Sequence, residues 1–581
     1  MPLGRFLAAV EDRIATMPAG ELREVVLAFA ETVEASERPV FLQRFGARPA
    51  RPVEPVDALL ADVELLEEEA EATGEPGWDD YDEYDDRYGW SSDDEFREPD
   101  WTPNLVELLR RTGVVFLKGD PSAAAHAYER LFGVAESAME NGWSVAADPG
   151  DTDVMKEAAA RYLRAVGESG ERDDRPDRLR RAASLLGRAL VGDAVSYAAV
   201  EGARVAAPAE REKLLEDWVL ALAPLAQKDN HYDGDWAHRL LLEVVEQLEG
   251  LPGLAKLARG GGQRAGRTFL AWFDAARRQG DDPMALIAGE EGLRSLTFSA
   301  ERATLAERMA VMADGAEQFE DAVAARVEAW DSVPSLDRLL KVVKAARRAD
   351  VEKETITELA KSRRRSGIAA PLRVVLLVLG GRLDTAVKEN RERSAPNTDK
   401  SHRAADASLA AEVLIPILLT AGVDPTRCEG FSESVVAGLL NDAEALVDRG
   451  SFASSFTCGF DEDDGDPGSP HDLALGGLLV MTLEGMAIPT ARRHLYLDAG
   501  SALAADAVAR IVANKERRRY SQAAALAVAH AEAIAITKGR AAGDAAVDTA
   551  QSRYPRHTAY RSELVTTRTR SPFLTSPARL R

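Results

Sequence analysis

Residues 116–136 read FLKGDPSAAAHAYERLFGVAE, and this stretch predicts the joint of a helical hairpin. Gly119 supplies the left-handed backbone conformation that ends one helix, and Asp120 caps the next helix, with Pro121 at its first position. Small residues and a tyrosine then recur at helical spacing, so they share one face of the second helix: Ala124, Ala127, Tyr128 and Leu131. The segment therefore predicts two helices joined by a tight turn.

Similar phrases recur later, as GGRLDTAVKENR from Gly380 and RRYSQAAALAVAHAEAI from Arg518. Recurrence of one supersecondary unit is typical of a stacked array, in which each repeat buries its apolar stripe against its neighbours. The 581 residues are rich in Ala, Leu, Glu and Arg, the strongest helix formers. We therefore predict an all-α fold, an α-solenoid of antiparallel helical hairpins.

The overall charge and the cysteine content limit the function classes. The formal net charge is −25, which opposes general attraction to nucleic acid or to an anionic membrane surface. Only Cys428 and Cys458 are present, so a disulfide framework is not expected, and a cytoplasmic location is the simplest prediction. The longest uncharged apolar stretches, 413–423 and 473–483, are shorter than the roughly 20 residues that span a bilayer, and they predict buried helices.

Changes in composition divide the chain into segments. One internal stop lies at Gly250 and Pro252, which end the apolar stripe that begins at Trp236. The predicted segments are an N-terminal helical cap (1–50), an acidic, aromatic-rich strap or linker (51–103), a helical repeat array (104–392), a flexible joint (393–406), C-terminal helical repeats (407–565) and a basic tail (566–581).

The acidic strap is the strongest compositional break. Residues 62–100 contain 18 Asp and Glu residues but only Arg87 and Arg97 as cations. Aromatic residues are interleaved with the acids, and five of them are candidate partner-binding residues: Trp78, Tyr81, Tyr84, Tyr88 and Trp90. The strap is either a solvated loop whose aromatic side chains pin it to neighbouring helices, or a docking segment for a cationic partner.

Three segments together resemble a bacterial family of helical-repeat proteins that includes the helical portions of SWIM zinc-finger-containing proteins. They are FLAAVEDRIATMPAGELREVVLAFAETVEASERPVFLQRF at 6–45, WTPNLVELLRRTGVVFLKGDPSAAAHAYERLFGVAE at 101–136 and NKERRRYSQAAALAVAHAEAIAITKGRAAGDAAVDTAQSRYPRHTAY at 514–560. The zinc module of that family needs a Cys-x-Cys pair followed by Cys-x-His, and here Cys428 and Cys458 are isolated. The resemblance implies a tetratricopeptide-like (TPR-like) scaffold without the zinc element, and it transfers no catalytic residue.

Two stretches imitate ligand-binding loops. GGQRAGRT at 261–268 has phosphate-loop spacing, but the preceding segment is helical, and a Gly-rich turn between helices explains it better. DNHYDGD at 229–235 begins like a calcium loop, but its twelfth position is Leu240 where the loop needs a bidentate Glu.

No other pattern supplies a site for chemistry. A loop with Cys458, several Asp residues and His471 matches no structural zinc spacing. The eight histidines are scattered, and no Ser or Cys sits in a nucleophile turn. We therefore predict no catalytic residue, no metal and no cofactor.

Clusters of basic residues interrupt the acidic background. They are 341–348, 361–365, the cluster of Lys515, Arg517, Arg518 and Arg519, and the tail from Arg553 to Arg581. Such clusters either pair with acidic neighbours and keep the array in solution, or form a surface for nucleic acid, a protein groove or the acidic strap. Arg517, Arg518 and Arg519 are therefore candidate partner-binding residues.

The leading hypothesis is a non-catalytic scaffold that binds a protein partner along its concave surface. If the acidic strap is the docking element, that partner carries positive charge. One alternative is a nucleic-acid-associated protein that uses the Arg-rich clusters. Another is an enzyme whose site is assembled across repeats.

Overall fold

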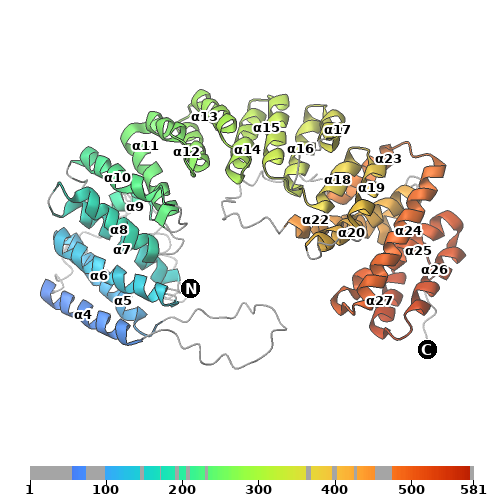
Figure 1. The fold of residues 1–581 in the computed structure, drawn as a ribbon, viewed down its shortest axis with the longest axis horizontal. Coiled ribbons are helices and arrows are strands. Elements are labelled where there is room, and N and C mark those ends of the chain that lie inside the picture. Colours follow the sequence, from blue (N-terminus) through green and yellow to red (C-terminus); the bar gives the residue numbers. More distant parts are fainter. Residues whose placement is uncertain are drawn as a thin grey trace, which may run out of the picture. The chain divides into compact units, whose positions relative to one another are not determined.

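The structure, a computed structural model, describes residues 55–73, 99–143, 145, 149–170, 172–189, 195–204, 208, 210–228, 233–361, 368–394, 402–423, 428–451 and 474–575. Within these residues every regular element is an α-helix or a short 3-10 helix (Figure 1). The prediction of an all-α protein is confirmed. The N-terminal cap and the five strap aromatics lie outside the described residues.

The chain divides into two compact units between Gly250 and Leu251. Helix α11 (Asp233–Arg259) runs through this boundary, but Gly250 interrupts it with φ 64° and ψ −152°. That conformation is open almost only to glycine, because a side chain would collide with the backbone. The predicted stop at Gly250 and Pro252 is therefore confirmed, and it coincides with the boundary between the units.

The first unit is a succession of helices that pack in chain order. From α4 to α7, each helix contacts both the next one and the next but one, and α8 contacts α10. The helices that precede α11 are α4 (Val56–Thr73), α5 (Thr102–Leu117), α6 (Pro121–Glu140), α7 (Pro149–Glu168), α8 (Arg175–Ala189), α9 (Tyr197–Gly202) and α10 (Arg211–Leu225).

The predicted joint between residues 116 and 136 forms the turn between α5 and α6. Gly119 has φ 102°, and the Asp120 carboxylate accepts a hydrogen bond from the Ala123 N–H at 3.0 Å. The four residues predicted to share a face of α6 are all fully buried: Ala124, Ala127, Tyr128 and Leu131. Both the hairpin and its buried face are confirmed.

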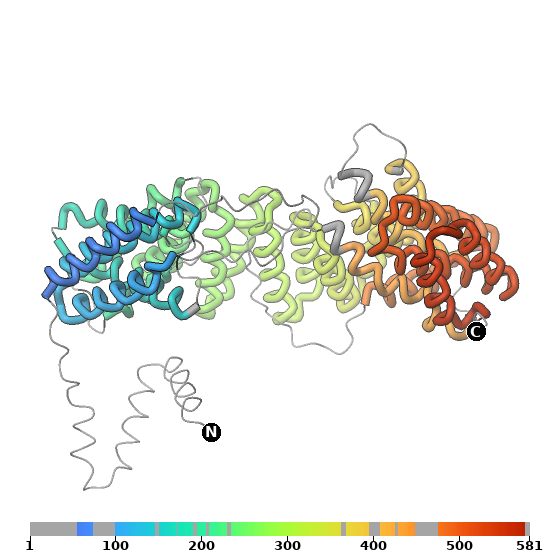
Figure 2. Tube along the Cα trace, turned by 90° about the horizontal axis from the view of Figure 1, so that it is seen from below, coloured from blue at the N-terminus to red at the C-terminus, as the bar shows by residue number. Residues whose placement is uncertain are grey.

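The second unit begins in the same manner. Its helices after α11 stand side by side in Figure 2, and each from α12 to α20 packs against the next along the chain. Their bounds are α12 (Ala265–Arg278), α13 (Asp282–Ser295), α14 (Ala300–Gly315), α15 (Phe319–Ser332), α16 (Leu336–Arg348), α17 (Glu352–Lys361), α18 (Ala370–Leu379), α19 (Leu383–Ser394) and α20 (His402–Val423).

The last part of the second unit packs around two long helices, α20 and α24 (Thr490–Ala513), which contact each other and α25 (Tyr520–Lys538). Helix α25 in turn packs against α26 (Arg540–Arg553) and α27 (Thr558–Arg568). The remaining elements are η2 (Phe431–Glu433), α21 (Val435–Asn441), α22 (Ala443–Ser451), α23 (Leu475–Gly485) and η4 (Arg517–Arg519).

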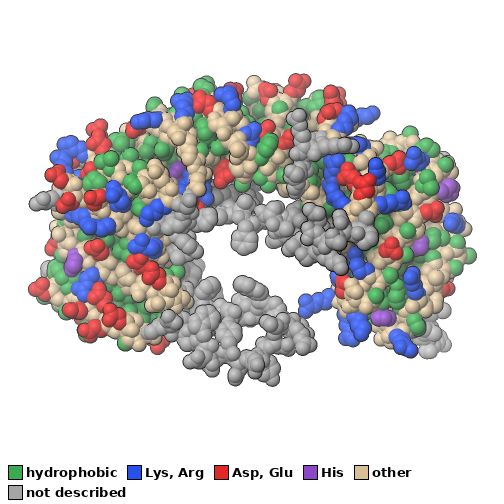
Figure 3. All heavy atoms as spheres, viewed as in Figure 1, with side chains coloured by type: hydrophobic (Ala, Val, Ile, Leu, Met, Phe, Trp, Pro, Cys, Tyr) green, Lys and Arg blue, Asp and Glu red, His purple; other side chains and the backbone are tan. Residues whose placement is uncertain are grey.

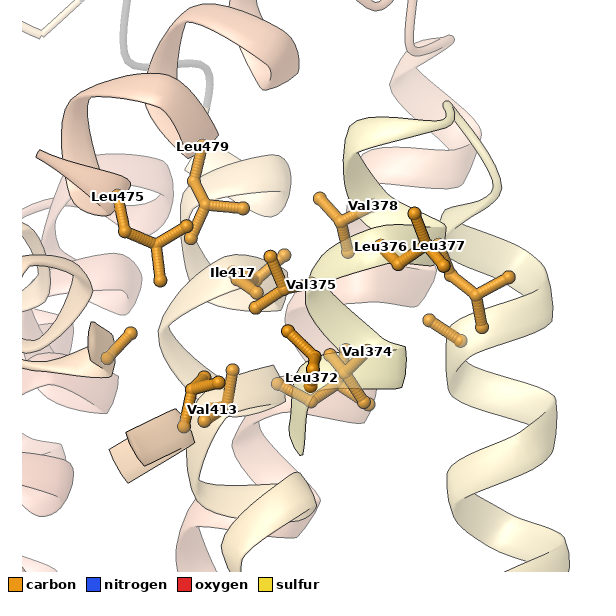
Figure 4. Close-up of a cluster of buried hydrophobic side chains, with 14 of the residues drawn as sticks. Leu372, Val374, Val375, Leu376, Leu377, Val378, Val413, Ile417, Leu475 and Leu479 are labelled. Carbon is orange, nitrogen blue, oxygen red and sulfur yellow. The ribbon is translucent and has the colours of Figure 1, made fainter. Parts of the chain in front are cut away.

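Helix α18 lies in the main core of the second unit. Its side chains are buried on every face, and Figure 4 shows Val375 directed toward Ile417 of α20, with Leu475 and Leu479 of α23 in the same cluster. Burial on all faces explains why α18 has no polar stripe. Residues 413–423, predicted as a buried helix, are buried throughout. Across the described parts of the chain, no helix is both long and apolar enough to cross a membrane.

Candidate functional site

The three candidate arginines Arg517, Arg518 and Arg519 form the short helix η4, between α24 and α25. The turn before it places Lys515 in the left-handed region, with φ 57°. Lys515, Arg517 and Arg518 are exposed, whereas Arg519 is half-buried. The three arginines therefore have different environments, although they are adjacent in the sequence.

Arg519 is directed inward, toward the buried carboxylate of Glu412 in α20. The Glu412 side chain is only 1% exposed, and Arg519 Nη2 lies 2.6 Å from its Oε1. Arg510 of α24 reaches the same oxygen with its Nη2 at 2.8 Å. The other carboxylate oxygen accepts a hydrogen bond from Gln522 Nε2 of α25 at 2.7 Å. One carboxylate thus ties together α20, α24, η4 and α25.

A second acid completes the environment of Arg519. Glu516 Oε2 lies 3.0 Å from Arg519 Nη1, at the start of the same turn. Burial is the largest single influence and lowers the pKa of Arg519, but the hydrogen bonds and charges of Glu412 and Glu516 outweigh it and raise this pKa above its ordinary value. Arg519 is therefore a fixed cation that holds the turn, and its guanidinium is occupied within the protein.

A second basic turn lies next to the first, between α26 and α27. Tyr520, which follows Arg519, approaches Nδ1 of His557 with its hydroxyl at 3.3 Å, and the two rings meet edge to face. Arg553 is the last residue of α26 and Arg556 lies in the turn that ends at His557, and both side chains are exposed. The contact between Tyr520 and His557 therefore brings two basic turns to the same end of the C-terminal helices.

We call these exposed cations the C-terminal basic surface, and its members are Lys515, Arg517, Arg518, Arg553 and Arg556. In Figure 3, Lys and Arg side chains gather along the lower edge of the second unit, over the region of α27. Guanidinium groups recognise carboxylates and phosphates through paired hydrogen bonds. This surface can therefore hold an anionic group.

The other basic clusters are used within the fold where the structure describes them. Arg347 pairs with Glu352 at 2.7 Å, and Arg348 reaches Asp314 at 3.3 Å. Lys341 pairs with Asp337 at 2.8 Å, one turn away on the same helix. For these residues, the interpretation that they pair with acidic neighbours is confirmed. Residues 363–365 lie outside the described part of the chain.

The phosphate-loop imitation at 261–268 is a turn between helices α11 and α12. Gly261 and Gly262 have φ values of 72° and 103°, and the Thr268 hydroxyl donates to the Arg264 carbonyl at 3.2 Å. The strand that a phosphate loop follows is replaced by the end of α11, as the sequence indicated.

The two candidate metal loops fall mostly outside the described residues. This holds for 229–232 and for the loop from Cys458 to His471. Leu240, the twelfth position of the calcium-loop imitation, is buried in the apolar face of α11. Among the residues that the structure describes, no three His, Cys, Asp or Glu side chains cluster as metal ligands would.

Sequence reasoning missed Glu412, the residue on which the candidate turn depends. A signal is present in the sequence, because Glu412 is the one charged residue in the apolar run AAEVLIPILL at 410–419. A lone carboxylate in such a run needs a buried partner. Its two arginine partners and Gln522 lie 98 to 110 residues away in the sequence, so their identity came only from the fold.

A comparison of the sequence with protein-family models, and another with curated proteins, found no match.

Proposed function

We propose that the chain is a TPR-like α-solenoid that acts as a non-catalytic scaffold for a protein partner. The observation that carries this proposal is a series of ion pairs and charged hydrogen bonds between helices at a nearly constant spacing in the sequence. The spacing is close to the length of one helical hairpin in tetratricopeptide arrays, about 34 residues.

The series lies in the first part of the second unit. Arg308 of α14 pairs with Asp274 of α12, 34 residues earlier. Arg338 of α16 then contacts Glu307 of α14 at 2.7 Å, 31 residues earlier. Each of these pairs joins a helix to the next but one, which is the relation between equivalent helices of successive hairpins.

Two further contacts have a similar spacing. Arg348 of α16 bonds to Asp314 of α14, 34 residues apart. Arg259 bonds with both of its donors to Glu291 of α13, 32 residues apart, at 2.8 and 2.9 Å. Repetition of charged contacts at one spacing is what stacking of similar units produces, so these contacts support a repeat array.

A scaffold role follows from how such arrays work. Each hairpin touches only its neighbours, and the stacked hairpins generate a long curved surface, the concave side of which commonly holds partners. Many arginines of the helices are already paired with acids inside the fold, so partner contacts are left to the helix turns and to the acidic strap. The resemblance to the helical portions of SWIM-type proteins points to the same role.

The test is affinity purification of the full chain from its native cells, coupled to mass spectrometry. We expect one or a few proteins to co-purify reproducibly, and chemical cross-links to map to the turns or to the strap. Deletion of residues 74–98 distinguishes docking on the strap from docking on the helix turns, because a partner that docks on the strap is then lost. Recovery of no reproducible protein partner would refute the scaffold proposal.

A further inference from the structure

We propose that the C-terminal basic surface binds an acidic segment of a partner protein. This inference rests on the proposed scaffold function and adds where the partner docks and what chemistry it presents. It differs from docking through the acidic strap, which would require a cationic partner.

The first step is that the surface is rigidly built. Glu412 is buried and holds Arg519 and Arg510 from two different helical elements at 2.6 and 2.8 Å. Because Glu412 fixes Arg519, its neighbours Arg517 and Arg518 are exposed to solvent at a defined place. A surface whose cations are positioned in advance loses less entropy when it binds an anion.

The second step is the local balance of charge. Residues 501–581 contain 14 Lys and Arg but only 6 Asp and Glu, in a chain whose net charge is −25. Four of the six acids are occupied within the fold: Glu532 is fully buried, Glu516 pairs with Arg519, and Asp544 and Asp548 pair with Arg568 at 2.8 and 3.1 Å. The exposed charge at this end of the molecule is therefore strongly positive.

The third step distinguishes an acidic peptide from a nucleic acid. Proteins that bind single strands offer open aromatic rings on which bases stack. Here Tyr554 is the aromatic residue of the second turn, and its ring is engaged by Arg553 at 5.9 Å and by the edges of His557 and Tyr560.

The extent of the surface leads to the same choice. Its five cations lie on two short turns, whereas a nucleic acid continues as a polyanion in both directions over a chain with excess negative charge. A short acidic segment can end within the surface, and its carboxylates match the paired donors of arginine.

The experiment measures binding of a fluorescein-labelled, Glu-rich peptide to the full chain by fluorescence anisotropy at low salt. The variant Arg517→Glu with Arg518→Glu reverses two exposed cations. The matched control is Lys538→Glu with Lys388→Glu, which makes the same change in charge at exposed positions elsewhere in the second unit. Circular dichroism checks that both variants keep their helices.

We expect the peptide to bind the native chain and the control variant alike, and to bind Arg517→Glu with Arg518→Glu about tenfold more weakly, because two exposed ion pairs are lost and each reversed charge repels the peptide. Raised salt should weaken binding. A photoreactive form of the peptide should label residues 515–519 and 553–557.

Three results would overturn the inference: no binding to the native chain, equal loss in the control variant, or tighter binding of a single-stranded oligonucleotide that depends on the same two arginines. The scaffold proposal fails separately. If a cellular partner is recovered equally by the native chain and by Arg517→Glu with Arg518→Glu, the scaffold stands and this surface does not. If no partner is recovered but the peptide binds, the scaffold proposal fails and the anion-binding surface stands.

Discussion

Glu412 determines how three helices and one turn meet, although it is a single side chain. Its carboxylate is buried in α20 and accepts donors from α24, η4 and α25. A buried pair of this kind contributes little compared with an apolar substitute, but removal of one partner leaves the other charges without compensation. The network therefore fixes the arrangement more than it adds to stability.

Replacement of Glu412 by Gln should loosen this end of the second unit. We expect a loss of about 3 kcal/mol, the lower end of the range for a broken buried pair, because both arginines are partly exposed and can regain water. Amide hydrogen exchange of peptides from α20 and α25 would report it. Glu516→Gln is the control, since its pair is partly exposed and should cost less than about 1 kcal/mol. Equal effects of the two variants would contradict the role given to Glu412.

Glu532 of α25 is a second buried acid, and it contacts the start of α21. Its carboxylate accepts a hydrogen bond from the Val436 N–H at 3.1 Å. Burial raises the pKa of Glu532, and the hydrogen bonds from Ser571 and from the backbone of Val435 and Val436 only partly oppose this. The pKa in the folded protein is thus above the ordinary value of 4.5.

The pH dependence of stability follows from this direction. Because the folded protein binds the Glu532 proton more tightly than the unfolded chain does, this contribution to stability is complete below pH 4.5 and is lost as the pH rises through the folded pKa. The Tm of the native chain minus that of Glu532→Gln should therefore increase as the pH falls from about 7 toward 4.5. Scanning calorimetry across this range measures it, and a constant or decreasing difference would show that the pKa is not raised.

The sequence could predict some of these residues but not others. Gly119 and Asp120 act within a few residues of their own position, so local rules of turns and caps located them. The contact between Glu412 and Arg519 joins positions 107 apart in the sequence, and which cation would meet that acid depends on how α20 and α25 pack. The different environments of Arg517, Arg518 and Arg519 could not be predicted either, because the sequence alone does not distinguish three consecutive arginines.

At the scale of elements, close helix packing in the second unit depends on glycines. Gly292 of α13 faces α14, and a Cβ there would collide with Leu305 Cδ2 and lie 3.2 Å from Phe269 Cβ. In contrast, Gly133 in the middle of α6 has no neighbouring atom within 4 Å of such a Cβ. Gly292 therefore allows close packing between helices, whereas Gly133 does not.

Alanine at these two positions should therefore have opposite effects on stability. Gly133→Ala should stabilise by up to about 1 kcal/mol, since alanine favours the helix. Gly292→Ala gains the same propensity but crowds the interface, and overpacking costs about 1–3 kcal/mol, so we expect a net loss. Thermal unfolding of the two variants beside the native chain tests this. An unchanged or higher Tm for Gly292→Ala would mean that α13 and α14 lie further apart.

The cap of α6 gives a test of the element that the sequence predicted best. Asp120→Ala removes the acceptor of the Ala123 N–H and should cost about 1 kcal/mol, whereas Asp120→Asn retains an acceptor and should change little. Faster exchange of the first amides of α6 in the alanine variant alone is the expected observation. Equally accelerated exchange in both variants would show that the carboxylate charge, and not the hydrogen bond, stabilises the start of α6.

At the scale of the whole molecule, the chain consists of two units joined at Gly250. Separate expression of residues 1–250 and 251–581 should give two fragments that each show a helical circular dichroism spectrum and a cooperative thermal transition, because each contains its own buried core. A fragment 251–581 without a cooperative transition would contradict this division.

The extent of prediction differs at this scale too. Helical content and the stop at Gly250 followed from composition and from local punctuation. The division into two compact units did not, because a helix stop does not by itself mark a unit boundary. Gly119 also ends a helix with a positive φ, and it lies inside the first unit.

The contacts at spacings of 31 to 34 residues have one more implication. Helix α14 carries both halves of such a joint, with Arg308 for α12 and with Glu307 and Asp314 for α16. A tandem copy of such a segment would contain both the arginine and the acids that pair with neighbouring copies. This protein could therefore gain or lose length by whole copies while the ion pairs at each junction still formed.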